Sequence, residues 1–183
     1  METQRPINIH AIRALPFLEI KTLSDLIWYA NEDSRKMLAD ERFIPASEEW
    51  WRRESLDKRL MENPDKPACF ACYAGAVIRG TLGIGADTRI RGTLDEITNK
   101  YRDVITPESF VPDVANILTA LDNAREGNYN GAMHELTGNY EFYDERLLKM
   151  EAVDYWEFYG QDEFEKFITE MDKVADKLEG MGY

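Results

Sequence analysis

The 183-residue sequence contains few of the residues on which most catalytic and metal sites depend. It has two cysteines, Cys69 and Cys72, and two histidines, His10 and His134. Two cysteines do not form the disulfide framework of a small secreted protein, so we expect a reducing compartment. Two histidines disfavour most enzymes that need an imidazole base, although neighbouring carboxylates leave acid–base chemistry open.

Long apolar runs and secretion signals are also missing. No stretch of about 18 apolar residues occurs, so we expect no membrane-spanning helix and no membrane partner. Residues 1–6 lack the apolar core of a signal peptide, which favours a cytoplasmic protein. Hydrophobic residues still make up 44% of the chain and aromatic residues 11%, which is enough for a normal core.

Basic residues are scarce in one half of the chain. Residues 1–92 contain 14 acidic and 14 basic side chains, whereas residues 93–183 contain 21 acidic and 8 basic ones. The whole net charge of −13 therefore lies in the acidic half. An acidic surface repels nucleic acid and attracts basic partners, so we expect no direct nucleic-acid binding. Core residues continue across the charge step, which predicts one domain over residues 1–183.

The spacing of apolar residues predicts a mainly α, single compact helical domain. Its centre is expected to be a small-residue buried helix at about 68–82, because that low-charge segment allows close approach of neighbouring backbones. The glycines at 83–92 leave room for a short β-hairpin. Thr22 and Asp25 form a capping box for the first helix. Helices are expected at 22–38, 47–62, 94–101, 112–126, 128–136 and 162–179.

The Cys69-Phe-Ala-Cys72 motif is the one short motif with known chemistry. A redox role needs a thiolate of lowered pKa at a helix N-terminus, and the motif precedes a predicted helix. The segment after it is apolar, which favours buried, unreactive thiols instead. A Cys₂His₂ metal site would need every cysteine and histidine of the chain, and the histidines are not closely spaced. We therefore expect no metal and no cofactor.

The acids near the end of the chain carry the sharper functional signal. Residues 139–183 contain 13 acids and 5 bases, with tyrosines and tryptophans between them. Duplex DNA presents one negative charge per about 1.7 Å of its axis, and carboxylates on a rigid helical scaffold imitate that pattern. The alternative is an acidic surface that serves solubility alone. The predicted partner-binding residues are Glu141, Asp144, Glu145, Glu151, Asp154, Glu157, Asp162, Glu163, Glu165, Glu170, Asp172, Asp176 and Glu179.

Two segments resemble small uncharacterised proteins of tailed bacteriophages. The first runs from Cys69 to Gly83 and contains Ala-Gly-Ala-Val followed by Thr-Leu-Gly. The second is Leu118-Thr-Ala-Leu-Asp-Asn-Ala-Arg-Glu-Gly127, followed by a short helix at 129–136. The resemblance covers about a third of the chain and transfers no functional residues. It implies a phage protein that acts in the cytoplasm of a bacterial host cell.

The sequence thus leads to a hypothesis of binding rather than catalysis. The protein is predicted to be a non-enzymatic, phage-type inhibitor or interaction protein. Its acidic C-terminal face would occupy a basic, nucleic-acid-binding surface of a host protein, as a DNA mimic or anti-defence protein does. Two alternatives stay open: a small thiol-dependent redox protein or enzyme that uses Cys69 and Cys72, and an accessory or assembly protein without a role for the acidic face. Homodimer formation is also left open.

Overall fold

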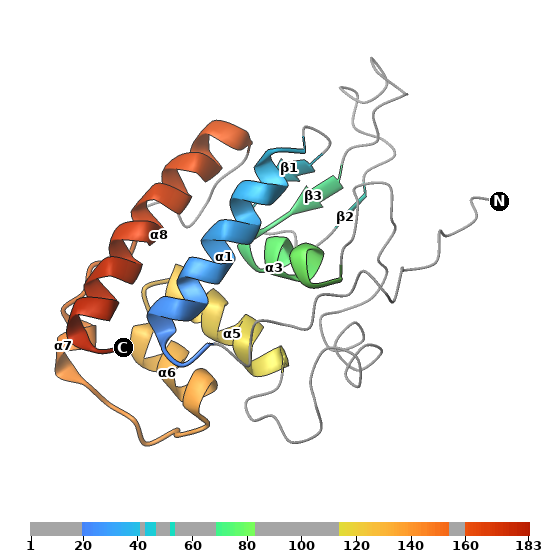
Figure 1. The fold of residues 1–183 in the computed structure, drawn as a ribbon. Helices are drawn as coiled ribbons and strands as arrows, with labels where there is room; N and C mark the ends of the chain where they lie inside the picture. The colour runs from blue at the N-terminus through green and yellow to red at the C-terminus, as the bar shows by residue number, and fades with distance from the viewer. Residues whose placement is uncertain (1–19, 41–42, 47–51, 54–68, 83–113, 154–159) are drawn as a thin grey trace, which may run out of the picture.

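Helices dominate the computed structural model of the chain (Figure 1). The structure describes residues 20–40, 43–46, 52–53, 69–82, 114–153 and 160–183. The mainly α-helical fold, with helices packed on one another, is therefore confirmed. The expected hairpin at 83–92 and the expected helix at 94–101 lie outside the described residues. In chain order the elements are α1 (Leu23–Leu38), β1 (Phe43–Pro45), β2 (Arg52–Arg53), β3 (Cys69–Ala71), α3 (Tyr73–Leu82), α5 (Val114–Arg125), α6 (Tyr129–Thr137), α7 (Glu145–Leu148) and α8 (Gln161–Met181).

The first helix begins where its capping residues predict. The Thr22 side chain accepts a hydrogen bond from the Asp25 backbone N–H, and the Asp25 carboxylate accepts one from the Thr22 backbone N–H. This reciprocal pair satisfies two backbone donors that a helix start leaves without partners. Arg35 and Lys36 lie in the last turn, where their charge stabilises the negative end of the helix dipole.

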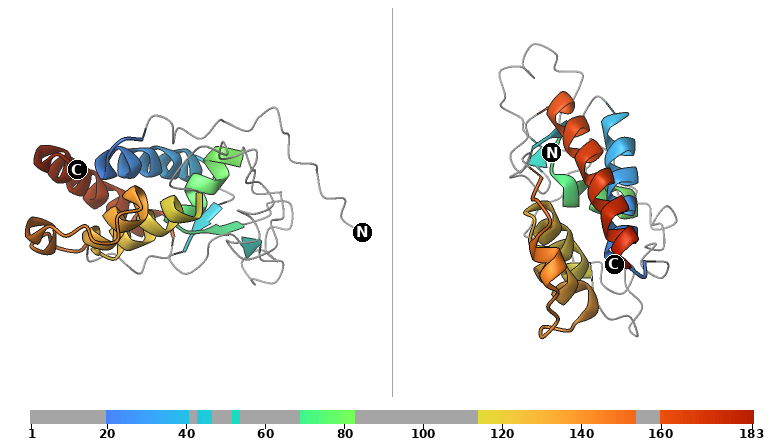
Figure 2. Two further views of the ribbon diagram at one scale, coloured as in Figure 1. Left: turned by 90° about the horizontal axis from the view of Figure 1, so that it is seen from below. Right: turned by 90° about the vertical axis from the view of Figure 1, so that its left-hand side faces the viewer.

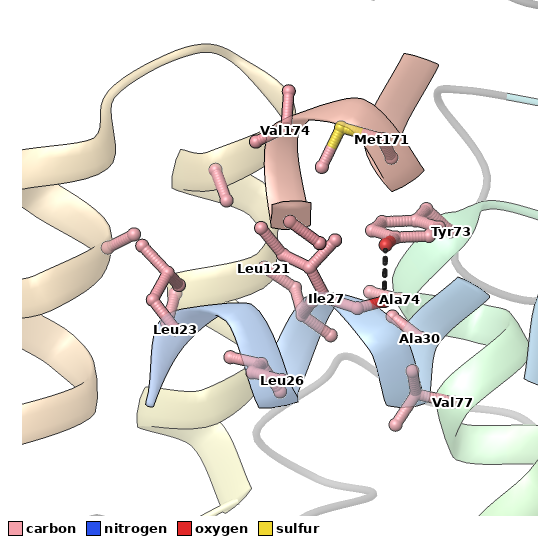
Figure 3. Close-up of a cluster of buried hydrophobic side chains, with 14 of the residues drawn as sticks. Leu23, Leu26, Ile27, Ala30, Tyr73, Ala74, Val77, Leu121, Met171 and Val174 are labelled. Atoms are coloured by element: carbon pink, nitrogen blue, oxygen red, sulfur yellow. Dashed lines mark hydrogen bonds between the residues drawn. The ribbon is translucent and has the colours of Figure 1, made fainter. Parts of the chain in front are cut away.

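The core lies between two helical layers. α1 and α8 run side by side in one layer, and α5 and α6 form the second layer across the core (Figure 2). Ile27, Leu121 and Met171 come from three different helices and are fully buried together (Figure 3). The predicted inward residues of the last helix are all buried, namely Phe164, Phe167, Ile168, Met171, Val174, Ala175 and Leu178. One core cluster includes residues of every described helix, whereas a single domain over residues 1–183 stays a prediction.

A small mixed sheet at one end of the helices corrects two details of the sequence interpretation. β3 is central, pairing with β1 in parallel and with β2 antiparallel. The buried helix therefore begins at Tyr73 rather than near residue 68, because residues 69–71 form β3. The helix expected at 47–62 is wrong at Arg52–Arg53, which form β2. The conformation of such short segments depends on the distant strands with which they pair, and the local spacing of apolar residues does not reveal those strands.

The turn between α5 and α6 depends on a glycine. Gly127 has φ = 78°, and a Cβ at this position would lie 2.5 Å from the Cβ of Ala152. Only glycine combines this backbone conformation with such a close approach. Asn128 then caps α6 by accepting a hydrogen bond from the Gly131 N–H, and Gly138 ends the helix in the left-handed conformation. Both ends of this predicted helix are thereby confirmed.

Candidate interaction surface

The thiol candidate lies at the start of α3 and is buried. The Cys72 carbonyl accepts the first hydrogen bond of the helix from Ala76 N at 2.9 Å, and its Sγ accepts one from Gly75 N at 3.4 Å. A helix N-terminus favours a thiolate, but burial in apolar surroundings disfavours the charge more strongly. Burial therefore raises the pKa of the Cys72 thiol to about 11. At neutral pH this thiol is protonated, which supports core packing rather than redox chemistry at Cys72.

His134, the histidine within the described residues, holds the loop that follows α6. His134 lies on α6 and its Nε2 donates to the carbonyl oxygen of Phe142 at 2.7 Å. Its ring also lies 6.2 Å from that of Tyr140. Within the described parts of the chain, no group of three or more His, Cys, Asp or Glu side chains is arranged to hold a metal ion. None of the described helices is long and apolar enough to cross a membrane.

The solvent-facing side of α8 separates its charges into rows. Residues three, four or seven apart on a helix lie on the same side. By this spacing Glu165, Asp172, Asp176 and Glu179 form one row, which we call the α8 acidic row. Lys166, Lys173 and Lys177 form a neighbouring row that also contains Glu163 and Glu170. The acidic row extends over about 21 Å of helix at 1.5 Å per residue. The net negative charge of α8 therefore lies along the acidic row, because the lysines offset the acids of the neighbouring row.

One member of the acidic row holds α8 against α1. The Asp172 carboxylate accepts a hydrogen bond from Asn31 Nδ2 at 2.8 Å and forms an ion pair with Arg35. Asn31 is fully buried, and its Oδ1 accepts a hydrogen bond from the Tyr73 hydroxyl at 2.6 Å. A continuous set of hydrogen bonds thus runs from the core at α3 to the surface at α8. These bonds fix the α8 acidic row relative to α1.

A second part of the surface presents exposed aromatic residues. The tyrosine segment, residues 139–151, contains the turn after α6 and the short helix α7. Tyr140 and Tyr143 are 64% and 67% exposed, and Leu148 is 60% exposed. Phe142, between the tyrosines, packs instead against the core and against the ring of Tyr183. Tyrosine is enriched among the residues that dominate binding at protein interfaces, so exposed tyrosines in one short segment make it a candidate interaction site.

The backbone of the tyrosine segment is held by side chains of α6. Asn130 is buried and forms two hydrogen bonds with the backbone of Asp144, from Nδ2 to the carbonyl at 3.1 Å and from the amide to Oδ1 at 2.8 Å. His134 holds the Phe142 carbonyl, as described above. The Asn139 side chain accepts from Glu141 N at 3.2 Å. The exposed tyrosines are therefore carried on a fixed loop.

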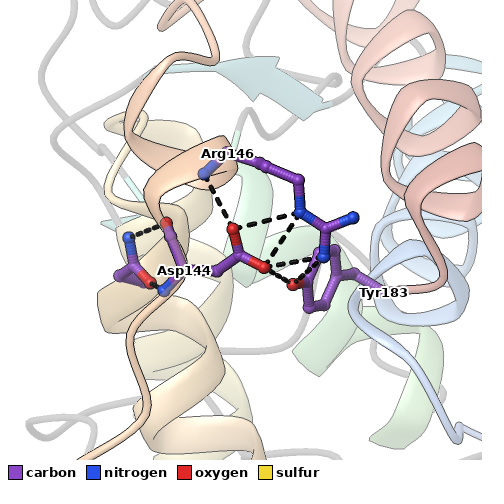
Figure 4. A network of polar contacts seen from close by, with 4 residues as sticks. Asp144, Arg146 and Tyr183 are labelled. Atoms are coloured by element: carbon purple, nitrogen blue, oxygen red, sulfur yellow. Dashed lines mark hydrogen bonds and ion pairs between the residues drawn. The ribbon is translucent and has the colours of Figure 1, made fainter.

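Asp144, Arg146 and Tyr183 join the tyrosine segment to the end of α8 (Figure 4). Asp144 caps α7 by accepting from Arg146 N at 2.7 Å, and it binds the Arg146 guanidinium with an Nη2–Oδ2 distance of 2.7 Å. The Tyr183 hydroxyl donates to the same carboxylate, and the guanidinium carbon of Arg146 lies 5.3 Å from the Tyr183 ring centre. The Arg146 bonds, followed by the Tyr183 bond, hold the pKa of Asp144 well below its usual range.

The structure divides the thirteen predicted acids into four groups. Asp154 and Glu157 lie outside the described residues. Four acids pair with cations of the same chain: Asp144 with Arg146, Glu145 with Lys149, Glu170 with Lys173, and Asp172 with Arg35. Glu163 is exposed and takes part in a further interaction. The exposed acids with no cationic partner among the described residues are Glu141, Glu151, Asp162, Glu165, Asp176 and Glu179.

The exposed side chains of the tyrosine segment could not be identified one by one from the sequence. The sequence places tyrosines among the acids, but it does not show that Tyr140 and Tyr143 point outward while Phe142 points inward. The pair Leu147-Leu148 carries a usable signal, because in a one-turn helix on a surface the two neighbours cannot both face the core. Leu147 is buried and Leu148 is exposed.

Comparison with known proteins identified no relative of this chain. No family model, curated protein or solved structure matches the chain. The resemblance to tailed-phage proteins therefore stays a prediction.

Proposed function

We propose that this chain is a non-enzymatic interaction protein whose acidic surface binds a basic, nucleic-acid-binding surface of another protein. The observation that carries the proposal is the α8 acidic row, in which Glu165, Asp176 and Glu179 are exposed and have no cationic partner among the described residues. Carboxylates left without cations of their own are available to a partner. Their arrangement along one side of a helix gives that partner a linear acidic track.

The internal bonds of Asp172 strengthen the argument. An acidic side chain on a flexible surface loses conformational freedom when it binds, which weakens the interaction. Here the bonds from Asp172 to Asn31 and Arg35 hold the helix that carries the row against α1, so the positions of its acids along the surface are set before any partner arrives. A preformed row of negative charge also steers a basic partner during its approach.

Thiol chemistry at Cys72 is not favoured as a second function, whereas the side chain of Cys69 lies outside the described part of the chain. The pKa of Cys72 is raised to about 11 by burial, so this thiol is protonated at neutral pH and is a poor nucleophile. The host-directed part of the proposal depends on the resemblance to phage proteins alone. If the chain is a phage protein, its partner is a DNA-binding protein of the bacterial host, and the chain inhibits this partner by occupying its DNA-binding surface.

The test is affinity capture from a bacterial lysate at low ionic strength. The expected result is that a basic, nucleic-acid-binding protein is retained by the wild-type chain, is released by raised salt, and is displaced by added duplex DNA. Displacement by DNA follows because both ligands would occupy the same basic surface. Binding of DNA to the chain itself should be undetectable in a gel-shift assay, given the net charge of −13.

Two double variants distinguish the contribution of the α8 acidic row to binding from the effect of net charge. Glu165→Lys with Asp176→Lys should weaken partner binding by about tenfold or more, since each exposed charge pair contributes about 0.2–1 kcal/mol and reversal adds repulsion. Glu32→Lys with Glu126→Lys makes the same change of net charge at exposed sites on α1 and after α5, and should bind nearly as the wild type does. The two glutamates pair with Lys36 and Arg125 through exposed contacts that contribute little, and a urea unfolding curve of the control checks that it stays folded. Equal losses for both variants, or binding that is indifferent to salt, would contradict the proposal.

A further inference from the structure

The tyrosine segment combines exposed rings with acids that are adjacent in the sequence. Tyr140 is followed by Glu141, and Tyr143 lies two residues before Glu145. Both glutamates are exposed. Glu141 has no cationic partner among the described residues, and Glu145 reaches Lys149 at 3.8 Å through an exposed pair of the kind that contributes little.

The protein itself shows how a cation fits a tyrosine and a carboxylate together. Arg146 binds the Asp144 carboxylate through Nε and Nη2 while its guanidinium lies over the Tyr183 ring (Figure 4). A planar guanidinium makes both contacts at once, because its edge donates hydrogen bonds and its face stacks on the ring. A lysine ammonium is a compact, strongly hydrated charge and does not offer this combination.

We propose that the tyrosine segment binds an arginine-rich segment of the basic partner. Guanidinium groups stack on Tyr140 and Tyr143 and pair with Glu141 and Glu145, in the arrangement that Arg146 already has with Asp144 and Tyr183. This inference rests on the proposed function and assigns the chemistry of the partner's contact residues. The α8 acidic row then attracts the partner by charge, and the tyrosine segment selects arginine over lysine.

The rigidity of the loop supports this division of roles. Asn130 and His134 hold the backbone on either side of Tyr143, so the ring is presented from a fixed position. Tyrosine has two side-chain torsions to order on binding, which keeps the entropic loss low. The same features make exposed tyrosines effective in antibody binding sites.

The test compares arginine and lysine homopeptides of equal length and charge, binding to the full chain, by fluorescence anisotropy at low ionic strength. Lysine also makes cation–π contacts, so the full strength of two such contacts at exposed sites, about thirtyfold, is the upper bound of the preference expected for arginine. Tyr140→Leu with Tyr143→Leu should remove this preference while keeping apolar bulk. Tyr140→Phe with Tyr143→Phe should retain it, because the ring faces remain.

Outcomes of this comparison separate the two proposals. Equal, salt-sensitive binding of both peptides, or a preference that survives the leucine variant, overturns the arginine inference and leaves the proposed function standing. Failure of the chain to bind either peptide overturns both. Trp28→Leu is the matched control, since it removes a 36%-exposed aromatic ring from α1. If this control loses the preference as the leucine variant does, the assignment to the tyrosine segment is wrong.

Discussion

Removing the Tyr73 hydroxyl tests the buried hydrogen bonds that connect α3, α1 and α8. Tyr73 is 1% exposed, and its hydroxyl lies 2.6 Å from Asn31 Oδ1 and 3.2 Å from the Ile27 carbonyl oxygen. A hydroxyl has one proton, so the shorter contact is the main bond. The Ile27 carbonyl also accepts the ordinary helical bond within α1, whereas Asn31 Oδ1 has no other donor among the described residues.

The structure allows the effect of Tyr73→Phe to be estimated. The substitution keeps the ring, including its edge-to-face contact with Phe167 at 5.1 Å, and leaves Asn31 Oδ1 buried without a donor. A buried acceptor left unsatisfied costs about 1–3 kcal/mol, so we expect the free energy of unfolding to fall by about 2 kcal/mol. The measurement is urea unfolding followed by circular dichroism. The dependence of the free energy of unfolding on urea concentration should not change, because the substitution leaves the surface that unfolding exposes nearly the same.

Tyr129→Phe is the matched control for this prediction. Tyr129 is also 1% exposed, but its hydroxyl donates to the backbone carbonyl of Glu151 at 3.2 Å, at an exposed residue. Water can replace the lost donor there, so the loss should be about 1 kcal/mol or less. If the two variants lose equal stability, or if Tyr73→Phe loses under about 0.5 kcal/mol, the Asn31 network does not hold the helices together as argued.

Three further predictions follow from single residues. Gly127→Ala should lower the free energy of unfolding by about 3 kcal/mol, because it adds strain at positive φ and a clash with Ala152, whereas Gly138→Ala, at positive φ in open space, should cost about 1 kcal/mol. Asp144 has a lowered pKa, so its contribution to stability is present above about pH 4 and is lost as the pH falls below that value. Asp144→Asn should therefore lower stability at neutral pH and lose less on acidification than the wild type, which urea unfolding at both pH values checks; a constant difference would contradict the assignment. The Cys72 thiol, with its pKa raised to about 11, should resist iodoacetamide in the native state and react after unfolding, as peptide mass spectrometry would show; rapid native labelling would refute it.

The helices were predictable because their signals are local. The capping box at Thr22 and Asp25 specifies the start of α1 within four residues of sequence, and the apolar spacing of α8 specifies which of its faces is buried. The strands were not predictable in this way. β3 gains its hydrogen bonds from Phe43–Pro45 and Arg52–Arg53, so its conformation depends on segments far away in the sequence. Cys-Phe-Ala is compatible with either state until those partners are placed.

The candidate surface was predictable in its charge and not in its geometry. A count of acids shows where the negative half of the chain is, but the count treats Asp172 and Glu165 alike. In the structure Asp172 is half-buried against Asn31 and Arg35, whereas Glu165 is exposed. Which acids pair within the protein depends on the way α1 and α8 pack, and this is a property of the tertiary structure.

The division of the acids determines how the binding surface must be tested. Reversing Asp144 or Asp172 would place a cation beside Arg146 or Arg35 and would break the bonds that position α7 and α8. Loss of binding in such a variant would report a displaced surface rather than a missing contact. Reversing Glu165 and Asp176 changes the charge and removes no hydrogen bond of the described structure. The distinction between a structural acid and a binding acid is therefore measurable, since the first kind lowers the free energy of unfolding and the second lowers affinity alone.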